Sequence, residues 1–463
     1  MLSFSCPTVG KRMGRREFLR LGSLGTAGLT LPTLIRAGST PASTADPSFG
    51  RAKRCLLVFL NGGPSQLDTW DMKPHAPADV RGELQPIPTN VPGIDICELM
   101  PLLAQQADKF KIVRSVTHPC VVHTTGVYTM LTGSIHPTPA VDQIRVSPED
   151  HPHFGAVFAK WQGWRQGRPP FVSLPRIFRA PPVEGIWAGQ NAGFLGRRYD
   201  PFVVLGDRAT AKFRLPDVEL PSDLKGQRLL DRRTLLQRVN KSFRAAEQTW
   251  DDFDTFYQQA FALLATSGVR DAVDLSREPA AIRDRYGRHL FGQGLLLARR
   301  LFEAGLPLVT VGWTDVEPPG EGGGEYDSHG RIYHHMRKRL VAPTDRGLAA
   351  LFADLAERRL LDDTLVVVMG EFGRTPRINV LAGRDHWPWT QSILLAGAGV
   401  SGGTIFGSTD REAAYPASHP VSPPDLAQTI LHLLGVPSDL MLADAQGRPV
   451  KACQGTVMAG LNA

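Results

Sequence analysis

The segment TLVVVMGEFGR at residues 364–374 joins a continuous apolar run to an abrupt polar end. Six residues that suit a strand are followed at once by Gly370 and Glu371. A continuous apolar run, unlike an alternating one, is typical of a strand covered on both faces, as in a parallel sheet. The segment therefore predicts a buried central strand. It also places the Glu371 carboxylate just beyond the carboxyl end of that strand, where open α/β sheets bind their ligands.

The same pattern recurs along the chain. The run CLLVFL at residues 55–60 is stopped by Asn61-Gly62-Gly63-Pro64. Further strands are expected at 111–116, 306–313 and 391–396, with helices at 126–133, 230–305, 348–355 and 424–434. Strands that alternate with helices predict an α/β fold in which helices sandwich a large, mainly parallel sheet.

Composition limits the class of protein. The chain has 463 residues, of which 42% are apolar and 21% charged. These values exclude a disordered polymer, a collagen-like fibre and a small disulfide scaffold. We expect a single α/β domain over residues 46–463. Within it, residues 165–230 are rich in Pro, Gly and Arg and are expected to form an irregular insertion or cap.

The positive charge is concentrated near the amino terminus. Six cationic residues against Glu17 give residues 1–38 a charge of +5, which leaves +2 of the total +7 for the remainder. Surfaces that follow a nucleic-acid backbone carry clustered cations. The sequence therefore argues against a nucleic-acid partner.

Residues 1–45 have the layout of an export signal. Arg15-Arg16-Glu17-Phe18-Leu19 precedes a Gly-rich apolar stretch at 21–35 and small residues at 37–45. The paired arginines resemble a twin-arginine signal, which implies the twin-arginine export machinery as a partner and a periplasmic or extracellular location. The alternative is an ordinary amphipathic helix. The stretch is too short and Gly-rich for a stable membrane span, and no other run approaches one.

Four cysteines lie beyond this segment: Cys55, Cys97, Cys120 and Cys453. An oxidising compartment would permit disulfides between them, and the spacing leaves any pairing open. Their spacing matches no zinc ribbon or CxxC motif. Cys55 opens an apolar run and is expected to be a buried thiol.

Three groups of His and carboxylate residues follow predicted strands. They are Asp327-Ser328-His329-Gly330, Glu371, and Arg384-Asp385-His386. Imidazole and carboxylate groups are ligands for divalent metals. Asp327 and His329 can reach one ion if the backbone is extended, because alternate side chains share a face. The alternative is an Asx turn beside a surface histidine.

Several of these motifs resemble a known superfamily. The turn and strand at 360–367, the helix at 425–434 and Leu-Thr-Gly at 131–133 are similar to the alkaline phosphatase/sulfatase core. Within that superfamily, the chain resembles the exported bacterial family called domain of unknown function 1501, over about residues 12–450. The motifs that carry this are GGPSQLDT at 62–69, GEFGRTP at 370–376 and GRDHWP at 383–388. The resemblance implies an alkaline phosphatase/sulfatase-like fold.

The resemblance also implies a divalent metal, which we expect to be zinc, manganese or calcium. Asp327, His329 and His386 correspond to the ligands of one ion, with Glu371 and Asp385 close by. The resemblance supplies fewer ligands for the second metal ion of the superfamily, because Asn61 stands where an Asp is usual and Phe372 where a His is usual. Asp68 can replace the missing aspartate or cap a helix.

The superfamily's nucleophile position falls on His123, counted back from Gly133. His123 can act as an acid/base or as the nucleophile, or it can activate a hydroxyl of Thr124, Thr125 or Ser65. The stretch at 120–124 lacks the Cys-x-Pro-Ser-Arg pattern of sulfatases.

Other charged and ring side chains have two possible uses. Arg374 and Arg384 can grip an anionic ester or pair with nearby carboxylates. Four further histidines with Pro neighbours are expected at the surface: His118, His136, His151 and His153.

Two functions remain as hypotheses. The first is an exported metal-dependent hydrolase of sulfate or phosphate esters, carried on a small molecule or a polysaccharide. The second is a catalytically degenerate member of the superfamily that binds an envelope ligand or serves as a scaffold, because fold alone does not settle activity.

Overall fold

The computed structural model describes residues 46–142, 145–165, 167–177, 186–215, 231, 234–235, 267–313 and 325–461. The chain divides into two units, residues 1–49 and 50–463, and all elements below belong to the second. The export segment predicted at 1–45 lies outside the described residues, as do residues 236–266 of the helical stretch predicted at 230–305.

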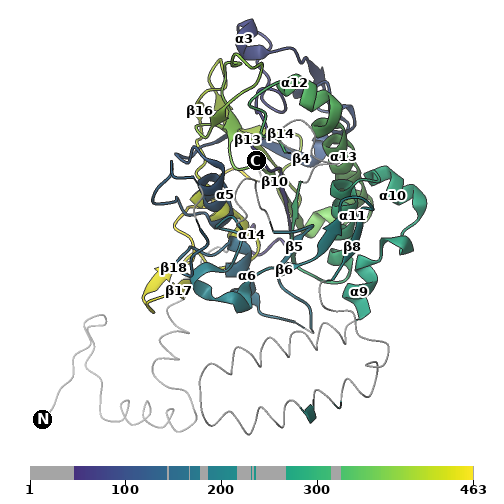
Figure 1. The fold of residues 1–463 in the computed structure, drawn as a ribbon, viewed down its shortest axis with the longest axis vertical. Helices are drawn as coiled ribbons and strands as arrows, with labels where there is room; N and C mark the ends of the chain where they lie inside the picture. Colours follow the sequence, from purple (N-terminus) through teal and green to yellow (C-terminus); the bar gives the residue numbers. More distant parts are fainter. Residues whose placement is uncertain are drawn as a thin grey trace, which may run out of the picture. The chain divides into compact units, whose positions relative to one another are not determined.

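An eight-stranded sheet forms the centre of this unit (Figure 1). Its strands, in spatial order, are β14 (Thr404–Phe406), β4 (Phe110–Val116), β13 (Gln391–Ala396), β10 (Thr364–Met369), β1 (Arg54–Phe59), β9 (Leu308–Gly312), β5 (Val172–Leu174) and β6 (Phe202–Val203). Neighbouring strands are parallel except at β13, which runs antiparallel to both β10 and β4. The predicted α/β fold with a large, mainly parallel sheet is confirmed.

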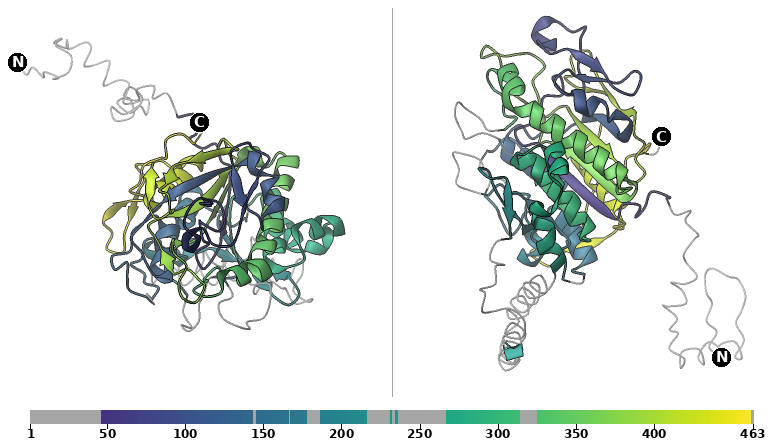
Figure 2. Two further views of the ribbon diagram at one scale, coloured as in Figure 1. Left: turned by 90° about the horizontal axis from the view of Figure 1, so that it is seen from above. Right: turned by 90° about the vertical axis from the view of Figure 1, so that its right-hand side faces the viewer.

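Helices cover both faces of the sheet (Figures 1 and 2). Leu57 and Val367, which are register partners on β1 and β10, pack with α5 (His123–Thr132), α6 (Phe154–Gln162) and α14 (Pro423–Leu433). Val58 and Val368 point to the other face, toward α11 (Leu290–Glu303) and α13 (Val341–Glu357). Burying each such side chain contributes about 1.5–3 kcal/mol. The double coverage explains why these strands are continuously apolar.

The remaining elements are short. They are α3 (Ala78–Arg81), β2 (Pro86–Pro88), β3 (Asp95–Cys97), α4 (Pro101–Ala104), η1 (Ala107–Lys109), η2 (Gly193–Leu195), η3 (Arg197–Tyr199), β7 (Leu205–Asp207), β8 (Lys212–Arg214), α9 (Ser267–Val273), η5 (Leu275–Arg277), α10 (Ala280–Tyr286), α12 (Ile332–His335), η6 (Met336–Leu340, a π-helical turn), η7 (Leu361–Asp363), β11 (Gly373–Arg374), β12 (His386–Trp387), β15 (Ser408–Thr409), β16 (Pro416–Ser418), β17 (Met441–Ala443) and β18 (Pro449–Lys451).

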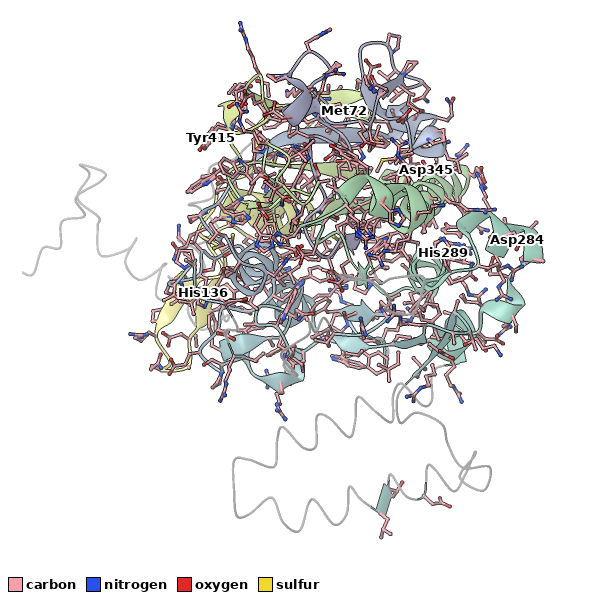
Figure 3. All side chains as sticks on the ribbon, turned by 45° about the horizontal axis from the view of Figure 1, so that its top comes forward. Met72, His136, Asp284, His289, Asp345 and Tyr415 are labelled. Atoms are coloured by element: carbon pink, nitrogen blue, oxygen red, sulfur yellow. The ribbon has the colours of Figure 1, made fainter. Side chains whose placement is uncertain are left out.

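Buried polar contacts fix the loops at the top of the sheet. Asp345 lies on α13 and is labelled in Figure 3. Its carboxylate accepts the backbone N–H groups of Leu102 at 3.2 Å and Leu103 at 2.7 Å, at the start of α4. Four N–H groups at the start of any helix lack partners within it, so a carboxylate there satisfies two of them. Asp345 therefore ties the segment around α4 to a core helix.

Most predicted elements lie where the sequence placed them, with two informative differences. The helix expected at 126–133 begins earlier, at His123, so that this side chain occupies the first turn. Residues 165–230, expected as an irregular insertion, contribute β5 and β6 to the central sheet in the described portion. Among the described residues, no helix has both the length and the apolar character that a membrane crossing requires.

Candidate metal centre

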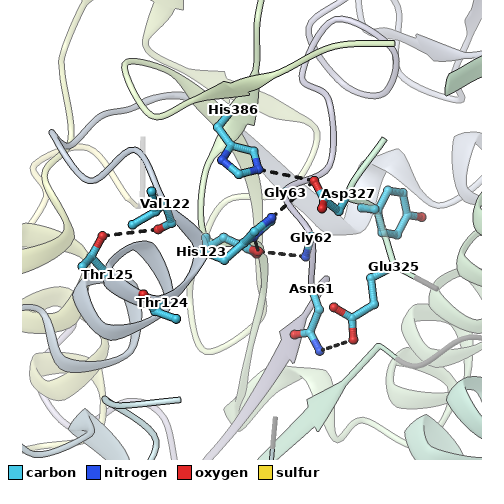
Figure 4. Close-up of polar contacts among 12 residues, drawn as sticks. Asn61, Gly62, Gly63, Val122, His123, Thr124, Thr125, Glu325, Asp327 and His386 are labelled. Atoms are coloured by element: carbon cyan, nitrogen blue, oxygen red, sulfur yellow. Dashed lines mark hydrogen bonds and ion pairs between the residues drawn. The ribbon is translucent and has the colours of Figure 1, made fainter. Parts of the chain in front are cut away.

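The candidate site lies beyond the carboxyl ends of the parallel strands (Figure 4). Asn61 follows β1, Glu371 follows β10, and Asp327 lies beyond β9. Parallel strands end at the same edge of a sheet, so these loops are brought together although they are distant in sequence. His123 joins them from the first turn of α5, and His386 from β12.

Three side chains form a compact group of potential metal ligands. Nε2 of His123 and Nε2 of His386 each lie 3.3 Å from Oδ1 of Asp327 (Figure 4). The three ligand atoms all lie within 4.8 Å of one another. We refer to His123, Asp327 and His386 as the central trio.

His329 borders the trio on its more exposed side. Its Nε2 atom lies 3.1 Å from Oδ1 of Asp327 and 3.0 Å from Nε2 of His386. The His329 side chain is 44% exposed, against 18% for His123 and 19% for His386. His329 is therefore the ring of the three that is most accessible from solvent.

All three imidazole rings are held through Nδ1. The acceptors are Oε1 of Glu371 for His123 at 2.6 Å, Oδ1 of Asp385 for His329 at 2.6 Å, and the carbonyl of Val121 for His386 at 3.0 Å. Each acceptor is an oxygen without a hydrogen, so Nδ1 must carry the proton. In the neutral ring this leaves a lone pair on Nε2, which is the arrangement that metal-binding histidines adopt.

The electrostatics of the trio favour an anionic Asp327. Burial raises the pKa of Asp327, but hydrogen bonds from His123, His329 and His386 and the charge of Arg374 lower it far below its usual range. Burial lowers the pKa of His123, and hydrogen bonds to Asp327 and Glu371 more than reverse this and raise it to about 9. In the absence of a metal ion, a proton on His123 balances the charge of the Asp327 carboxylate.

The contacts to Asp327 have lengths compatible with ligands that share a divalent ion, and all three ligand atoms of the trio lie within 4.8 Å of one another. Tetrahedral zinc, with bonds of about 2.0–2.1 Å, holds its ligand atoms about 3.3 Å apart. The contacts of His123, His329 and His386 to Asp327 are 3.1–3.3 Å long. Imidazole nitrogens suit zinc, whereas manganese and calcium prefer oxygen ligands. Of the three metals expected from the sequence, zinc matches this donor set best.

Glu371 contacts one ring of the trio, that of His123. It is fully buried, and its Oε1 atom accepts the Nδ1 proton of His123 and the backbone N–H of Gly62 at 2.9 Å. Its Oε2 atom is buried and has no hydrogen-bond partner among the described residues. Glu371 was predicted as a ligand, and here it positions His123 while keeping one oxygen free.

Gly62 is a site residue that the sequence patterns did not single out. Its φ is +96°, and a Cβ atom there would lie 2.4 Å from the backbone nitrogen of Asp327. Only glycine allows this close approach. The GGPS motif after β1 is the signal that could have indicated it.

A second group of oxygens lies below His123. Asn61 places Nδ2 3.5 Å from Oε1 of Glu325, and its own Oδ1 is buried without a partner among the described residues (Figure 4). Burial and the nearby charge of Glu371 raise the pKa of Glu325 to about 7. Sequence reasoning missed Glu325, because it ends a Gly-rich loop with no periodic pattern around it.

Both candidate substrate-binding arginines are buried and paired. Arg374 contacts Oδ1 of Asp327 through Nη2 at 2.7 Å and donates to the backbone carbonyls of Gly63 and Arg384. Arg384 binds Oδ2 of Asp68 through Nε at 2.7 Å. Neither guanidinium has any exposed surface. Pairing with carboxylates, the alternative to gripping an ester, is therefore the arrangement the structure contains.

Among the described hydrogen bonds, none of the three predicted hydroxyl nucleophiles contacts the trio: two donate to other carboxylates, and Thr125 donates to the backbone carbonyl of Pro139 at 2.8 Å. Ser65 donates to Oδ2 of Asp68 at 2.5 Å, and Thr124 donates to Oδ1 of Asp142 at 3.2 Å. Asp68 is enclosed by Ser65 and Arg384 rather than placed in the trio. The loop around Asp68 forms turns and no helix, so Asp68 does not cap one.

Asp385 contacts His329 and has no contact with Asp327 among the described hydrogen bonds and ion pairs.

Phe372 packs against two rings of the trio, with centroids 5.0 Å from His123 and 4.5 Å from His386. The ring of Trp187 stacks on His123, with centroids 5.9 Å apart.

Two histidine predictions were wrong. His118 and His153 were expected at the surface and are buried, with 3% and 1% exposure. His118 Nε2 lies 2.7 Å from the backbone carbonyl of Glu371, and Nδ1 of His153 accepts the N–H of Gly155 at the start of α6. At both positions tertiary packing buries a side chain that the neighbouring prolines had suggested was exposed.

The four cysteines beyond the first 45 residues are free thiols, and Cys55 is buried as expected.

Comparisons with known proteins give one family and several distant structures. The family described as "Protein of unknown function (DUF1501)" matches residues 52–461. No curated protein matches the chain in sequence.

The similar solved structures are distant. One is a sulfatase from Pseudoalteromonas sp., with 12% identity, a TM-score of 0.38, and coverage of 95% of this chain and 74% of that one. Another is a protein in the alkaline phosphatase superfamily from Vibrio parahaemolyticus, with 13% identity, a TM-score of 0.36, and coverage of 92% and 76%. A third is a lipoteichoic acid synthase from Listeria monocytogenes, with 10% identity, a TM-score of 0.37, and coverage of 94% and 81%. At this level of likeness the neighbours carry no argument about what this chain does.

Proposed function

The chain belongs to the DUF1501 family, whose description names no function, and we propose that it is a metal-dependent hydrolase of sulfate or phosphate esters. The substrate is a sulfated or phosphorylated small molecule or polysaccharide. The twin-arginine pattern at residues 15–16 supports the further proposal that the protein is exported to the periplasm or beyond.

One observation carries this proposal. Three imidazole rings, each with its Nδ1 proton already donated to an oxygen, direct Nε2 toward a single carboxylate oxygen of Asp327. At His329 and His386 the two Nε2 atoms lie 3.0 Å apart, so two neutral rings would set two lone pairs against each other. A proton on Nε2 of His329 or a cation held by the trio removes this conflict, and the convergence of three rings on one oxygen supports metal binding over an Asx turn with a surface histidine.

We assign the central trio to metal binding. A divalent ion held there would polarise an ester oxygen and lower the pKa of a bound water. Glu371 orients His123 through Nδ1, the Val121 carbonyl orients His386, and Arg374 holds the Asp327 carboxylate in place. Such supporting contacts fix ligand geometry and tautomer.

His329 and Asp385 form the exposed part of the site, and we assign to them the protonation of the leaving group. Asp385 accepts from Nδ1 of His329, and its hydrogen bond fixes the ring with Nε2 toward the trio. The hydrogen bond to Asp327 raises the pKa of His329, followed by that to Asp385, and both outweigh burial. A protonated imidazole at the mouth of the site is suited to general acid catalysis. This assignment replaces the role of metal ligand expected for His329 from the sequence.

The alternative function, a non-catalytic ligand-binding or scaffold protein, is favoured by a different observation. Asn61 and Phe372 replace two second-metal ligands of the superfamily, and the buried Arg374 and Arg384 offer no free cation to an ester. Loss of one ion of a two-metal pair should weaken phosphoryl transfer strongly. Metal content and turnover separate the two functions.

The experiment measures bound metal and turnover of an aryl sulfate and an aryl phosphate in the purified protein and in variants. We expect about one zinc ion per chain and slow turnover. Asp327→Ala and His386→Ala should lose both, and His136→Ala, at a partly exposed histidine outside the site, should lose neither. His329→Gln should keep the metal and lose turnover. Stoichiometric metal without turnover would favour the binding protein, and absence of metal would overturn the proposal.

A further inference from the structure

A basic cavity lies at the opposite edge of the sheet from the metal centre. It has a volume of about 420 Å³ and includes Lys53 and Arg54, at the start of β1, in its wall. Asn61, at the other end of β1, is separated from Lys53 by about 25 Å of extended chain. The cavity is therefore independent of the trio and of the function proposed for it.

Cations dominate the lining of this cavity. Lys53, Arg54, Arg165 and Arg168 face a single lining carboxylate, Glu303. Glu303 is already engaged, since its oxygens bind Nη1 of Arg299 at 2.7 Å and Nη1 of Arg358 at 2.9 Å. The lining thus carries four formal positive charges and a carboxylate that is neutralised from outside.

Two of the four cations have no acidic partner among the described residues. Lys53 and Arg54 share the carboxylate of Asp363. Within the described part of the chain, Arg165 and Arg168 form no ion pair, and Nε of Arg168 is buried without a hydrogen-bond partner. A buried, unpaired N–H of a charged group is costly, so such a group in a cavity indicates a ligand that accepts from it.

The backbone presents the two arginines together. The N–H of Arg168 donates to the carbonyl of Arg165 at 3.0 Å, which closes a tight turn. The Arg168 guanidinium lies over Gly305, where a Cβ atom would be 2.8 Å from Nη1. Gly305 has a φ of +85°, and its missing side chain leaves room for the guanidinium plane.

We propose that this cavity binds a tetrahedral oxyanion, sulfate or phosphate, either free or as an ester group. Arg165 and Arg168 supply planar, permanently charged donors that match such oxygens, and Lys53 adds a mobile ammonium at the rim. Gln162, also in the lining, can donate to an oxygen or to a sugar hydroxyl.

The test is isothermal titration of the full chain with sodium sulfate, sodium phosphate and a monosaccharide sulfate, at ionic strength held constant with sodium chloride. We expect saturable binding that weakens about tenfold in Arg168→Gln, the loss typical of one charge-assisted hydrogen bond. Arg165→Gln, at an exposed position that does not endanger folding, should weaken binding similarly. The charge-matched control Arg285→Gln, whose guanidinium pairs with Glu357 elsewhere, should change it less than twofold.

The arms of the experiment separate the possible ligands. Equal affinity for sulfate and for the monosaccharide sulfate identifies the free ion, whereas tighter binding of the ester identifies an esterified ligand. His386→Ala should leave this binding intact, which separates it from the metal centre. No saturable binding of any of the three probes, or equal weakening in Arg168→Gln and Arg285→Gln, overturns the proposal.

Discussion

Nδ1 of His123 donates a hydrogen bond to Oε1 of Glu371 at 2.6 Å, across 248 residues of sequence. The same Glu371 oxygen accepts the backbone N–H of Gly62. One buried carboxylate therefore links the loop after β1, the strand end of β10 and the first turn of α5. This contact sets the direction of the His123 ring, and with it the geometry of the trio.

Replacing Glu371 by Gln should reduce the affinity of the trio for a metal ion. The amide keeps the volume of the side chain and removes the charge that fixes the His123 tautomer. Loss of such a supporting contact typically costs 10–100-fold in metal affinity. Competition with a chelator measures this affinity, and Glu357→Gln, at an exposed ion pair, is the control. Unchanged affinity in the Glu371 variant would show that His123 does not bind the ion.

Gly62→Ala should destabilise the protein and the site together. The new Cβ atom would lie 2.4 Å from the Asp327 nitrogen, and the left-handed φ adds about 1–2 kcal/mol. Overpacking adds about 1–3 kcal/mol more. Gly93→Ala is the matched control, since Gly93 has a φ of +84° and no atom within 4 Å of the added carbon. Denaturant unfolding should show a clearly larger loss for Gly62→Ala, and equal losses would contradict the close approach.

His153 should make stability fall in acid. Burial lowers the pKa of His153 to about 3, against 6.5 for the free side chain. Between these values the unfolded chain binds the extra proton, so stability that is present above pH 6.5 is lost at about 1.4 kcal/mol per pH unit as pH falls.

His153→Asn removes this titration while keeping an acceptor for the N–H of Gly155 at the start of α6. Unfolding free energies at pH 8, 6.5 and 5 should show a shallower slope in the variant. His289, whose pKa burial and Arg346 lower to about 4, repeats the arrangement at α11, so the double variant should be shallower still. An unaltered slope in His153→Asn would mean that the ring is accessible to protons in the folded state.

Arg384→Met should destabilise the fold by about 3–5 kcal/mol, because Asp68 is then left as an unpaired buried charge. Adding Asp68→Leu should recover part of this loss. The recovery should be partial, since Arg384 also donates to the carbonyls of Val80 and Thr375. A double-mutant cycle by denaturant unfolding gives the coupling between the two residues. Additive losses would mean that the ion pair contributes nothing to stability.

Local patterns predicted the parts of the site that follow strands. Glu371 and Asn61 were placed at strand ends because continuous apolar runs stop at Gly and polar residues there. Asp327, His329 and His386 were grouped by their chemistry, and the structure brings their ligand atoms within 3.0–3.3 Å of one another. The roles within the group could not be predicted, since they depend on which atom each Nδ1 faces.

The arginines show why the remainder needed tertiary structure. Arg374 and Arg384 are of the residue type that binds anions. Both are nevertheless fully buried and pair with Asp327 and Asp68. Nothing in a linear sequence gives the depth of a loop side chain, because depth is set by the strands and loops that pack above it. The burial of His118 and His153 was mispredicted for the same reason.

The amino-acid sequence by itself determined the α/β class, the positions of the strands and the strand ends that carry the candidate site residues. It could do so because apolar runs, and the glycines that end them, are patterns of only a few residues. Tertiary structure alone decided that His123 lies beside Asp327 and His386, that Glu371 contacts Nδ1 of His123, and that Arg374 and Arg384 pair with Asp327 and Asp68. Those outcomes depend on contacts between residues 47 to 316 positions apart, which only the strand order of the sheet brings within hydrogen-bonding distance.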